Sequence, residues 1–206
     1  MSLVLPQQAN LAKKIPKKKF FENADVKSKI KQKFVDYIQT IIWKYKLSPL
    51  TINIKDTEQV PEIQIFEIYL KEYYIPEDVL KIIDKAIKTP VLYKFLYNEN
   101  FCYAIGYDRQ SKTKFYYSEW NEELDFDFNH LNLEKLYQNL IKEFIKIPKS
   151  EDQDFEEAIQ KDDQIKHLEK EIYTLNKKVK SEKQFNKKVE LNKQLNMKKQ
   201  EYDKLV

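Results

Sequence analysis

Glycine and cysteine each occur once among the 206 residues of this sequence, and histidine occurs twice. A single glycine excludes sites built from several glycines, such as a phosphate-binding loop, a dinucleotide-binding turn or a nucleophile elbow. A single cysteine excludes a disulfide framework and any thiolate metal cluster formed by this chain alone. No apolar run reaches the roughly 18 residues of a membrane-spanning helix, and no apolar leader stands near the N-terminus. We therefore expect a charged, cytoplasmic protein that makes no contact with membranes and uses no cofactor.

Arginine is almost absent, since the sequence contains 36 lysines and a single arginine, Arg109. Lysine attracts phosphate as a point charge and lacks the planar fork with which arginine reads bases. The first 50 residues carry eleven lysines against three acids, whereas the rest of the chain is close to balance or acidic. A segment this basic attracts polyanions whatever their sequence. An alternative is that lysine is enriched only because the whole composition favours Lys, Asn, Ile, Tyr and Phe.

The densest part of this positive segment supplies the candidate residues for binding the backbone of DNA or RNA. Phe20 is added to them because an aromatic ring beside basic groups can stack on exposed bases, although the two neighbouring Phe rings can equally be tucked into a core. The candidates are Lys13, Lys14, Lys17, Lys18, Lys19, Phe20, Lys27, Lys29, Lys31 and Lys33.

The hydrophobic pattern predicts an α+β fold in three parts. These are a basic N-terminal arm (residues 1–25), a globular domain (26–148) and a helical coiled-coil tail (149–206). The globular domain is expected to hold a four- or five-stranded, mainly antiparallel sheet with covering helices.

Spacing and breaker residues predict the individual elements of the globular domain. Apolar residues recur at helical intervals from Ile30 to Tyr45 and predict an amphipathic helix over residues 26–46. Asn132 is the expected N-cap of a later helix, and Gly106 inside a strand predicts a bulge or a close backbone approach. The remaining predictions are strands at 51–54, 62–71, 91–97, 101–108 and 112–120, and helices at 76–88 and 133–147.

The tail has no glycine or proline after Pro148. Its apolar residues follow a heptad spacing that slips to a second register, which is compatible with a stutter in one helix or with a turn in a helical hairpin. We favour one long helix because the intervening residues 181–184 have weak turn chemistry. A helix of about 50 residues is on the order of 75 Å long and cannot bury its seam alone. The expected partner-binding residues are Ile165, Leu168, Ile172, Leu175, Val179, Phe185, Val189, Leu191, Leu195, Tyr202 and Leu205.

One strand offers a weak catalytic pattern. Glu67, Tyr69 and Lys71 alternate onto one face of the strand at 62–71, where metal-dependent nucleases place an acid two residues before a lysine. Here the residue two before Lys71 is Tyr69, and a metal without its carboxylates does not generate hydroxide at neutral pH. We assign no catalytic residue and no metal site, and we expect the protein not to be an enzyme.

Several short motifs together resemble the uncharacterised bacterial and archaeal family known as domain of unknown function 4391, over nearly the whole chain. Members are often encoded beside helicases of superfamily 2 and restriction-type adenine methyltransferases, so the resemblance implies a part in defence against foreign DNA. It implies no catalytic residues. The motifs are IPKKKF (15–20), FVD (34–36), IIW (41–43), KLSP (46–49), TINI (51–54), EIQIFE (62–67) before Leu70 and Lys71, IDKAI (83–87), YYSEW (116–120) and EKQFNKKVELN (182–192).

Three functions remain open at this point. The first is a non-catalytic subunit of a DNA-processing or anti-phage, restriction-type assembly. In it the coiled coil would join a second copy, a helicase or a methyltransferase, and the lysines would meet the nucleic-acid backbone. The second is a degenerate or unusual metal-dependent nuclease. The third is a protein-protein adaptor that never contacts nucleic acid.

Overall fold

Six strands form one sheet in the order β1-β2-β3-β4-β5-β6, so every strand lies beside its neighbour in sequence. The computed structural model describes residues 5–22, 26–109, 112–145 and 154–206. The chain divides after Phe144 into two units, which we call the head (residues 1–144) and the tail (145–206). No helix in these described ranges combines the length and the apolarity that a membrane crossing requires.

Secondary structure in the head begins with a short 3-10 helix η1 at Gln7–Ala9. The strands are β1 (Asn10–Ile15), β2 (Ile38–Leu47), β3 (Ile63–Leu70), β4 (Val91–Tyr97), β5 (Asn100–Arg109) and β6 (Lys112–Tyr117). The other helices are η2 (Lys17–Phe20), α1 (Ser28–Tyr37), α2 (Pro49–Ile52), α3 (Glu77–Ile87) and α4 (Leu133–Lys142).

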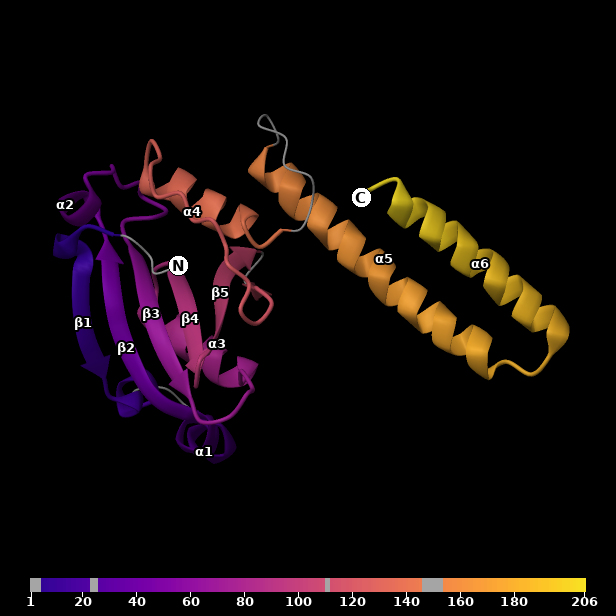
Figure 1. Ribbon diagram of the computed structural model, residues 1–206, viewed down its shortest axis with the longest axis horizontal. Coiled ribbons are helices and arrows are strands. Elements are labelled where there is room, and N and C mark those ends of the chain that lie inside the picture. The colour runs from indigo at the N-terminus through magenta and orange to yellow at the C-terminus, as the bar shows by residue number, and fades with distance from the viewer. Residues whose placement is uncertain (1–4, 23–25, 110–111, 146–153) are drawn as a thin grey trace. The chain divides into compact units, whose positions relative to one another are not determined.

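The α+β class and the mainly antiparallel sheet are confirmed, but the number of strands is six rather than four or five. All neighbouring pairs are antiparallel except β3 and β4, which are parallel and are connected through α3. The strand missed near the N-terminus is β1, which lies in the segment interpreted as an arm and pairs with β2. Figure 1 shows β1 at one edge of the sheet.

The helix predicted over residues 26–46 is wrong in its second half, because α1 ends at Tyr37 and β2 begins at Ile38. The pairing of β2 with β3 shifts register between Ile38 and Thr40, and again between Trp43 and Tyr45. A bulge places an extra residue in the strand, so that side chains three apart face the same side. Ile38 and Ile41 are both buried in this way, and their spacing imitates one turn of a helix.

The strand predicted at 51–54 is also wrong. Pro49–Ile52 forms the one-turn helix α2, in which Ser48 and Thr51 make a reciprocal capping box. Proline in the first turn and a hydroxyl residue before it favour a helix start over an extended strand.

The remaining predictions in the head are confirmed. β3, α3 and the meander of β4, β5 and β6 lie within a few residues of their predicted bounds. Asn132 is the N-cap of α4, since its side chain accepts a hydrogen bond from the backbone N–H of Lys135. α4 itself ends at Lys142, with Glu143 as its C-cap, so the helix predicted over 133–147 is five residues too long.

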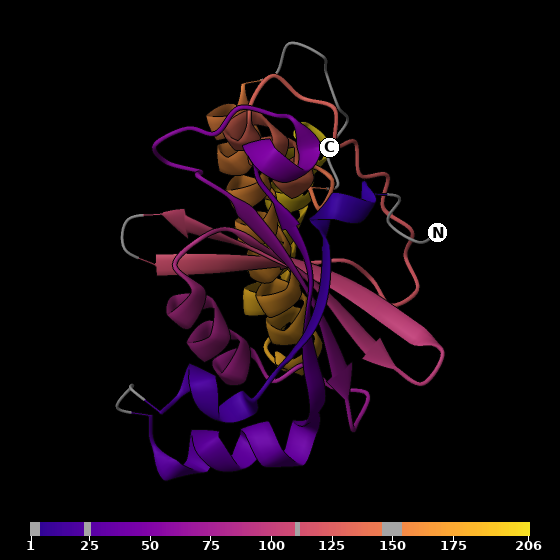
Figure 2. The ribbon, with the colours of Figure 1, turned by 90° about the vertical axis from the view of Figure 1, so that its left-hand side faces the viewer.

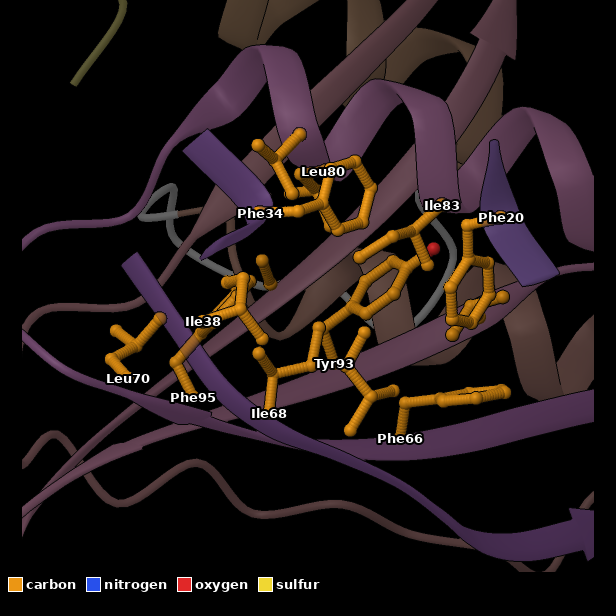
Figure 3. Packing of buried hydrophobic residues seen from close by; sticks show 14 residues of the cluster. Phe20, Phe34, Ile38, Phe66, Ile68, Leu70, Leu80, Ile83, Tyr93 and Phe95 are labelled. Atoms are coloured by element: carbon orange, nitrogen blue, oxygen red, sulfur yellow. The ribbon is translucent and has the colours of Figure 1, made fainter. Parts of the chain in front are cut away.

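The main hydrophobic core lies between the sheet and the helices α1 and α3 (Figures 2 and 3). Phe34 from α1, Leu80 and Ile83 from α3, and Tyr93 from β4 meet there and are all buried. The helix α4 lies on the other side of the sheet (Figure 2) and buries its own apolar stripe. The sheet is thus covered on both sides, which explains the continuous apolar run within β3.

Gly106 marks a close backbone approach, as the sequence predicts. A Cβ at this position would lie 3.1 Å from a ring carbon of Phe115 and 3.3 Å from a carboxylate oxygen of Asp84 on α3. The hydroxyl of Tyr137 on α4 donates to the backbone oxygen of Gly106. The missing side chain therefore lets α3 approach β5.

The tail consists of two helices, α5 (Phe155–Ser181) and α6 (Phe185–Asp203), so the single long helix favoured from the sequence is wrong (Figure 1). Glu182 adopts an extended conformation at φ −73° and ψ 127°, which ends α5. Its carboxylate accepts a hydrogen bond from the backbone N–H of Gln184 at 2.7 Å. This turn needs neither glycine nor proline, because no residue in it requires a positive φ.

Candidate nucleic-acid interface

The predicted lysines lie on β1, at one edge of the sheet (Figure 1), and on the helices η2 and α1 that follow it, with Lys27 as the N-cap of α1. All of β1 except Ile15 is exposed, and the bulge at Ala12, where φ is 46°, interrupts its pairing with β2. Lysines and bulges on an edge strand also prevent edge-to-edge aggregation, which is a structural role for Lys13 and Lys14.

Seven lysines of this region are exposed, and we call them the lysine surface. In the described part of the chain, none of them forms a salt bridge or donates a hydrogen bond from its ammonium group. The acids described in residues 10–37 are Glu22 and Asp36 alone. The described part of this segment therefore carries an excess of positive charge, and the lysine surface consists of Lys13, Lys14, Lys18, Lys19, Lys27, Lys29 and Lys31.

Lys17 is different from its neighbours, because its ammonium group closes the C-terminal end of α1. It donates to the backbone oxygen of Phe34 at 3.1 Å and to that of Ile38. Burial and the positive charges of Lys71 and Lys14 lower the pKa of Lys17. A cation at a helix C-terminus stabilises the helix dipole, so Lys17 has a structural role.

Replacing Lys17 by Met removes this donor and keeps an unbranched side chain. We expect the free energy of unfolding of the head to fall by about 1–2 kcal/mol, because the last carbonyls of α1 lose their cation. Urea unfolding followed by tryptophan fluorescence measures it. The exposed neighbour supplies the control, since Lys18→Met should change stability by less than about 0.5 kcal/mol. Equal losses in the two variants would contradict the capping role.

Lys33 and Phe20 are also engaged within the head. The ammonium group of Lys33 lies 2.6 Å from a carboxylate oxygen of Asp78 on α3, and this hydrogen bond raises the pKa of Lys33. The ring of Phe20 is buried in the main core, with an exposed fraction of 7%. This placement argues against base stacking by Phe20, the role considered from the sequence.

Glu67 and Lys71 do not form a common site. The carboxylate of Glu67 lies 3.5 Å from the ammonium group of Lys44. Lys71 follows the end of β3 and donates to the backbone oxygen of Val35 at 2.7 Å, so it caps α1 beside Lys17. Among the described residues no three Asp, Glu, His or Cys side chains come together as metal ligands. These contacts favour structural roles for both residues.

The predicted partner-binding residues lie on α5 and α6, except Leu205, which follows the end of α6. The contacts of Glu171 with Lys198 at 3.2 Å and of Glu169 with Tyr202 at 3.4 Å show that the helices are antiparallel. Ile165, Leu168 and Leu195 are buried, Phe185 and Val189 are exposed, and the remaining members, Ile172, Leu175, Val179, Leu191, Tyr202 and Leu205, are half-buried.

The tail therefore covers its seam only in part. A groove of about 560 Å³ runs between α5 and α6, with Leu175 and Met197 among the side chains that line it. Lys198 lines it as well and is paired with Glu171 and with Glu201 at 2.9 Å. Two helices leave such a seam open on their free sides, and a third or fourth helix closes it in helical bundles.

A family model described as Domain of unknown function (DUF4391) matches residues 3–201. The chain belongs to this family. The match covers both the head and the tail, which agrees with the resemblance seen in the sequence motifs. No curated protein and no solved structure was found to match the chain.

One feature of the interface has no signal in the charge pattern. Tyr69, Tyr73 and Tyr74 are exposed around the end of β3, next to the lysines that cap α1. The sequence shows three tyrosines in a strand and its following loop, and the packing of α1 against this loop brings Tyr74 beside Tyr37 at the end of α1.

Proposed function

We propose that this protein is a non-catalytic subunit of a DNA-processing or anti-phage assembly, whose head binds the nucleic-acid backbone through the lysine surface. The observation that supports this function best is the set of seven exposed lysines along β1, η2 and α1 with its N-cap, none of which forms a salt bridge with an acid that the structure describes. Lysine ammonium groups displace counterions from phosphates and do not discriminate bases, so the expected binding is strong at low salt and independent of sequence.

The sharpest test reverses charges that hold no structural contact. We expect the double variant Lys18→Glu and Lys19→Glu to bind duplex DNA about 10-fold or more weakly at low salt, and the slope of log affinity against log salt to become shallower by about 2. Fluorescence anisotropy with a labelled duplex measures both quantities. Lys17 stays unchanged in this design because it caps α1.

The tail offers a matched control with the same change of charge. Lys187 and Lys188 are consecutive, exposed and located on α6. Their double replacement by Glu should leave affinity and slope within about twofold of the unaltered protein, since only local phosphate contacts change the slope. Equal effects of the two double variants would mean that net charge alone, and not the lysine surface, causes the attraction.

We assign the tail to partner binding in the same assembly, by a second copy, a helicase or a methyltransferase. The half-buried seam residues and the groove that Leu175 and Met197 help to line support this role. Sedimentation of the full chain separates the alternatives. A concentration-dependent dimer indicates self-association, and a monomer that co-purifies with a helicase or methyltransferase from its host indicates a different subunit.

A protein-protein adaptor is the second candidate, and the partly open seam of the tail favours it as well. The two functions are separated by the head. If the unaltered protein binds neither duplex DNA nor single strands nor RNA at low salt, the adaptor function holds and the function proposed first is wrong.

A further inference from the structure

Three exposed tyrosines in the described part of the head lie within three positions of Lys71 in the sequence, and the exposed Val35 accepts a hydrogen bond from its ammonium group. Their exposed fractions are 52% for Val35, 36% for Tyr69, 52% for Tyr73 and 50% for Tyr74. Contiguous apolar groups on a protein surface mark binding sites more often than scattered ones do. We call residues 71–75, between β3 and α3, the tyrosine loop.

The tyrosine loop is attached to the end of α1. The backbone N–H of Lys71 donates to the oxygen of Tyr37 at 2.8 Å, and the Lys71 ammonium group donates to the oxygen of Val35. The ring of Tyr74 lies against that of Tyr37, with 5.2 Å between the ring centroids. These contacts fix the backbone of the loop while half of the Tyr74 side chain stays in solvent.

Tyr73 is held from the other side of the loop. Its ring stacks on that of Trp120 with centroids 4.2 Å apart, and it meets the ring of Tyr97 edge to face at 5.9 Å. The exposed half of Tyr73 is therefore a flat surface in a fixed orientation, which loses little conformational entropy when a ligand stacks on it.

Charges of both signs lie on the Tyr74 side of the loop, where Asp36 in the last turn of α1 is exposed and accepts a hydrogen bond from Gln32. The ammonium groups of Lys17 and Lys71 both donate to backbone oxygens of the last turn of α1, so two positive charges lie beside its C-terminal end. The nearby acids Asp78 and Glu77 are paired with Lys33 and Lys81, at 2.6 and 2.5 Å. Glu72 is exposed in the loop itself. Lysines beside exposed rings form the combination that binds single-stranded nucleic acid, where cations follow the phosphates and rings stack on bases.

We propose that Tyr73 and Tyr74 form a stacking surface for the bases of single-stranded nucleic acid whose phosphates lie on Lys71 and on the lysine surface. This inference rests on the proposed function and adds a preference to it. In a duplex the base faces are covered by their neighbours, so stacking on these rings favours unpaired strands over duplexes.

The test compares three labelled probes on the full-length protein at low salt, namely an oligothymidylate of about 20 nucleotides, an abasic strand of the same length and a duplex. We expect the double variant Tyr73→Ala and Tyr74→Ala to bind the oligothymidylate about 10-fold or more weakly, and the abasic strand and the duplex within about twofold of the unaltered protein. Tyr73→Phe with Tyr74→Phe keeps both rings and should keep the affinity. Tyr173→Ala removes a ring exposed to 60% on α5 and should have no effect.

A second variant tests the charge of the loop and leaves both tyrosine rings unchanged. Glu72→Gln removes the exposed acid of the loop, and it should strengthen binding of all three probes by about two- to threefold, since it removes repulsion of phosphate. Its effect at the loop distinguishes a ligand that passes over Tyr73 and Tyr74 from one held only by the lysine surface.

The outcomes separate failure of this inference from failure of the proposed function. If the oligothymidylate and the duplex bind but the alanine variants leave both affinities unchanged, the stacking surface is wrong and the lysine surface stands. An equal loss for the abasic strand would also refute stacking, because that probe has no bases. If the unaltered protein binds none of the three probes, both the inference and the proposed function fail, and a protein ligand covers these rings instead.

Discussion

Phe34→Ala is expected to lower the free energy of unfolding of the head by about 3–5 kcal/mol, because it leaves a cavity the size of a phenyl ring between α1 and the sheet. Phe34 is fully buried, and its ring meets that of Phe21 edge to face with centroids 5.1 Å apart. Such a loss is a large part of the roughly 5–15 kcal/mol by which domains are stable. The same change loosens α1, which carries Lys29 and Lys31 of the lysine surface and follows a third member, its N-cap Lys27.

Urea unfolding followed by tryptophan fluorescence isolates the head, since both tryptophans, Trp43 and Trp120, lie in it. The next residue supplies the control. Val35 is exposed to 52%, so Val35→Ala should change stability by less than about 0.5 kcal/mol. A loss below about 1 kcal/mol for Phe34→Ala would mean that α1 is not packed on the sheet as described.

Asp84→Asn is expected to stabilise the head at pH 7.5 by about 2–3 kcal/mol, and to have little effect at pH 4. Burial between α3 and β5 raises the pKa of Asp84 from 3.8 to about 6, and the nearby Asp108 adds to this. The hydroxyl of Tyr93, which donates to Asp84 at 2.9 Å, opposes the shift. Asparagine keeps an oxygen acceptor for that hydroxyl and carries no charge to desolvate.

The direction of this pH dependence follows from proton binding to Asp84. Because the folded head holds the Asp84 proton more tightly than the unfolded chain, its contribution to stability is complete below pH 3.8 and is lost as pH rises through about 6. Thermal unfolding at a series of pH values should therefore show a decline over this window that is absent in Asp84→Asn. Asp56→Asn changes an exposed aspartate and should leave the decline intact. If Asp84→Asn is less stable than the unaltered protein at pH 7.5, the account is contradicted.

Local signals in the sequence were sufficient to predict the secondary structure of about half of the head. The strands from β3 to β6 have short apolar runs that are separated by breaker or turn residues. The helix α4 is indicated by its N-cap Asn132 and its apolar stripe. These elements depend on neighbours within a few residues, so their patterns survive without knowledge of the fold.

β2 and the tail could not be assigned because their signals are ambiguous. Two bulges in β2 give its buried side chains a spacing that a helix also produces. The side chain of Glu182 stabilises the turn between α5 and α6, but glutamate also has a high helix propensity, so its presence does not predict a turn. β1 carries few apolar side chains toward a core, and only its pairing with β2 makes it a strand.

The candidate site also has a part that the sequence predicts and a part that depends on the fold. Charge composition identified the region of the lysine surface, whereas the separate roles of Lys17, Lys33 and Phe20 depend on contacts with α1, α3 and the core. The tyrosine loop lies more than 30 residues from α1 in sequence, and its exposure beside the lysines is a consequence of packing alone.

The central claim, that free lysines bind the nucleic-acid backbone, is tested most directly by the affinity of the unaltered protein for several unrelated DNA sequences over a series of salt concentrations. Seven lysines predict a slope of log affinity against log salt as steep as about −4 to −6, with the same affinity for every sequence at a given salt. Absence of binding at the lowest salt, or an affinity that salt does not change, would contradict the account.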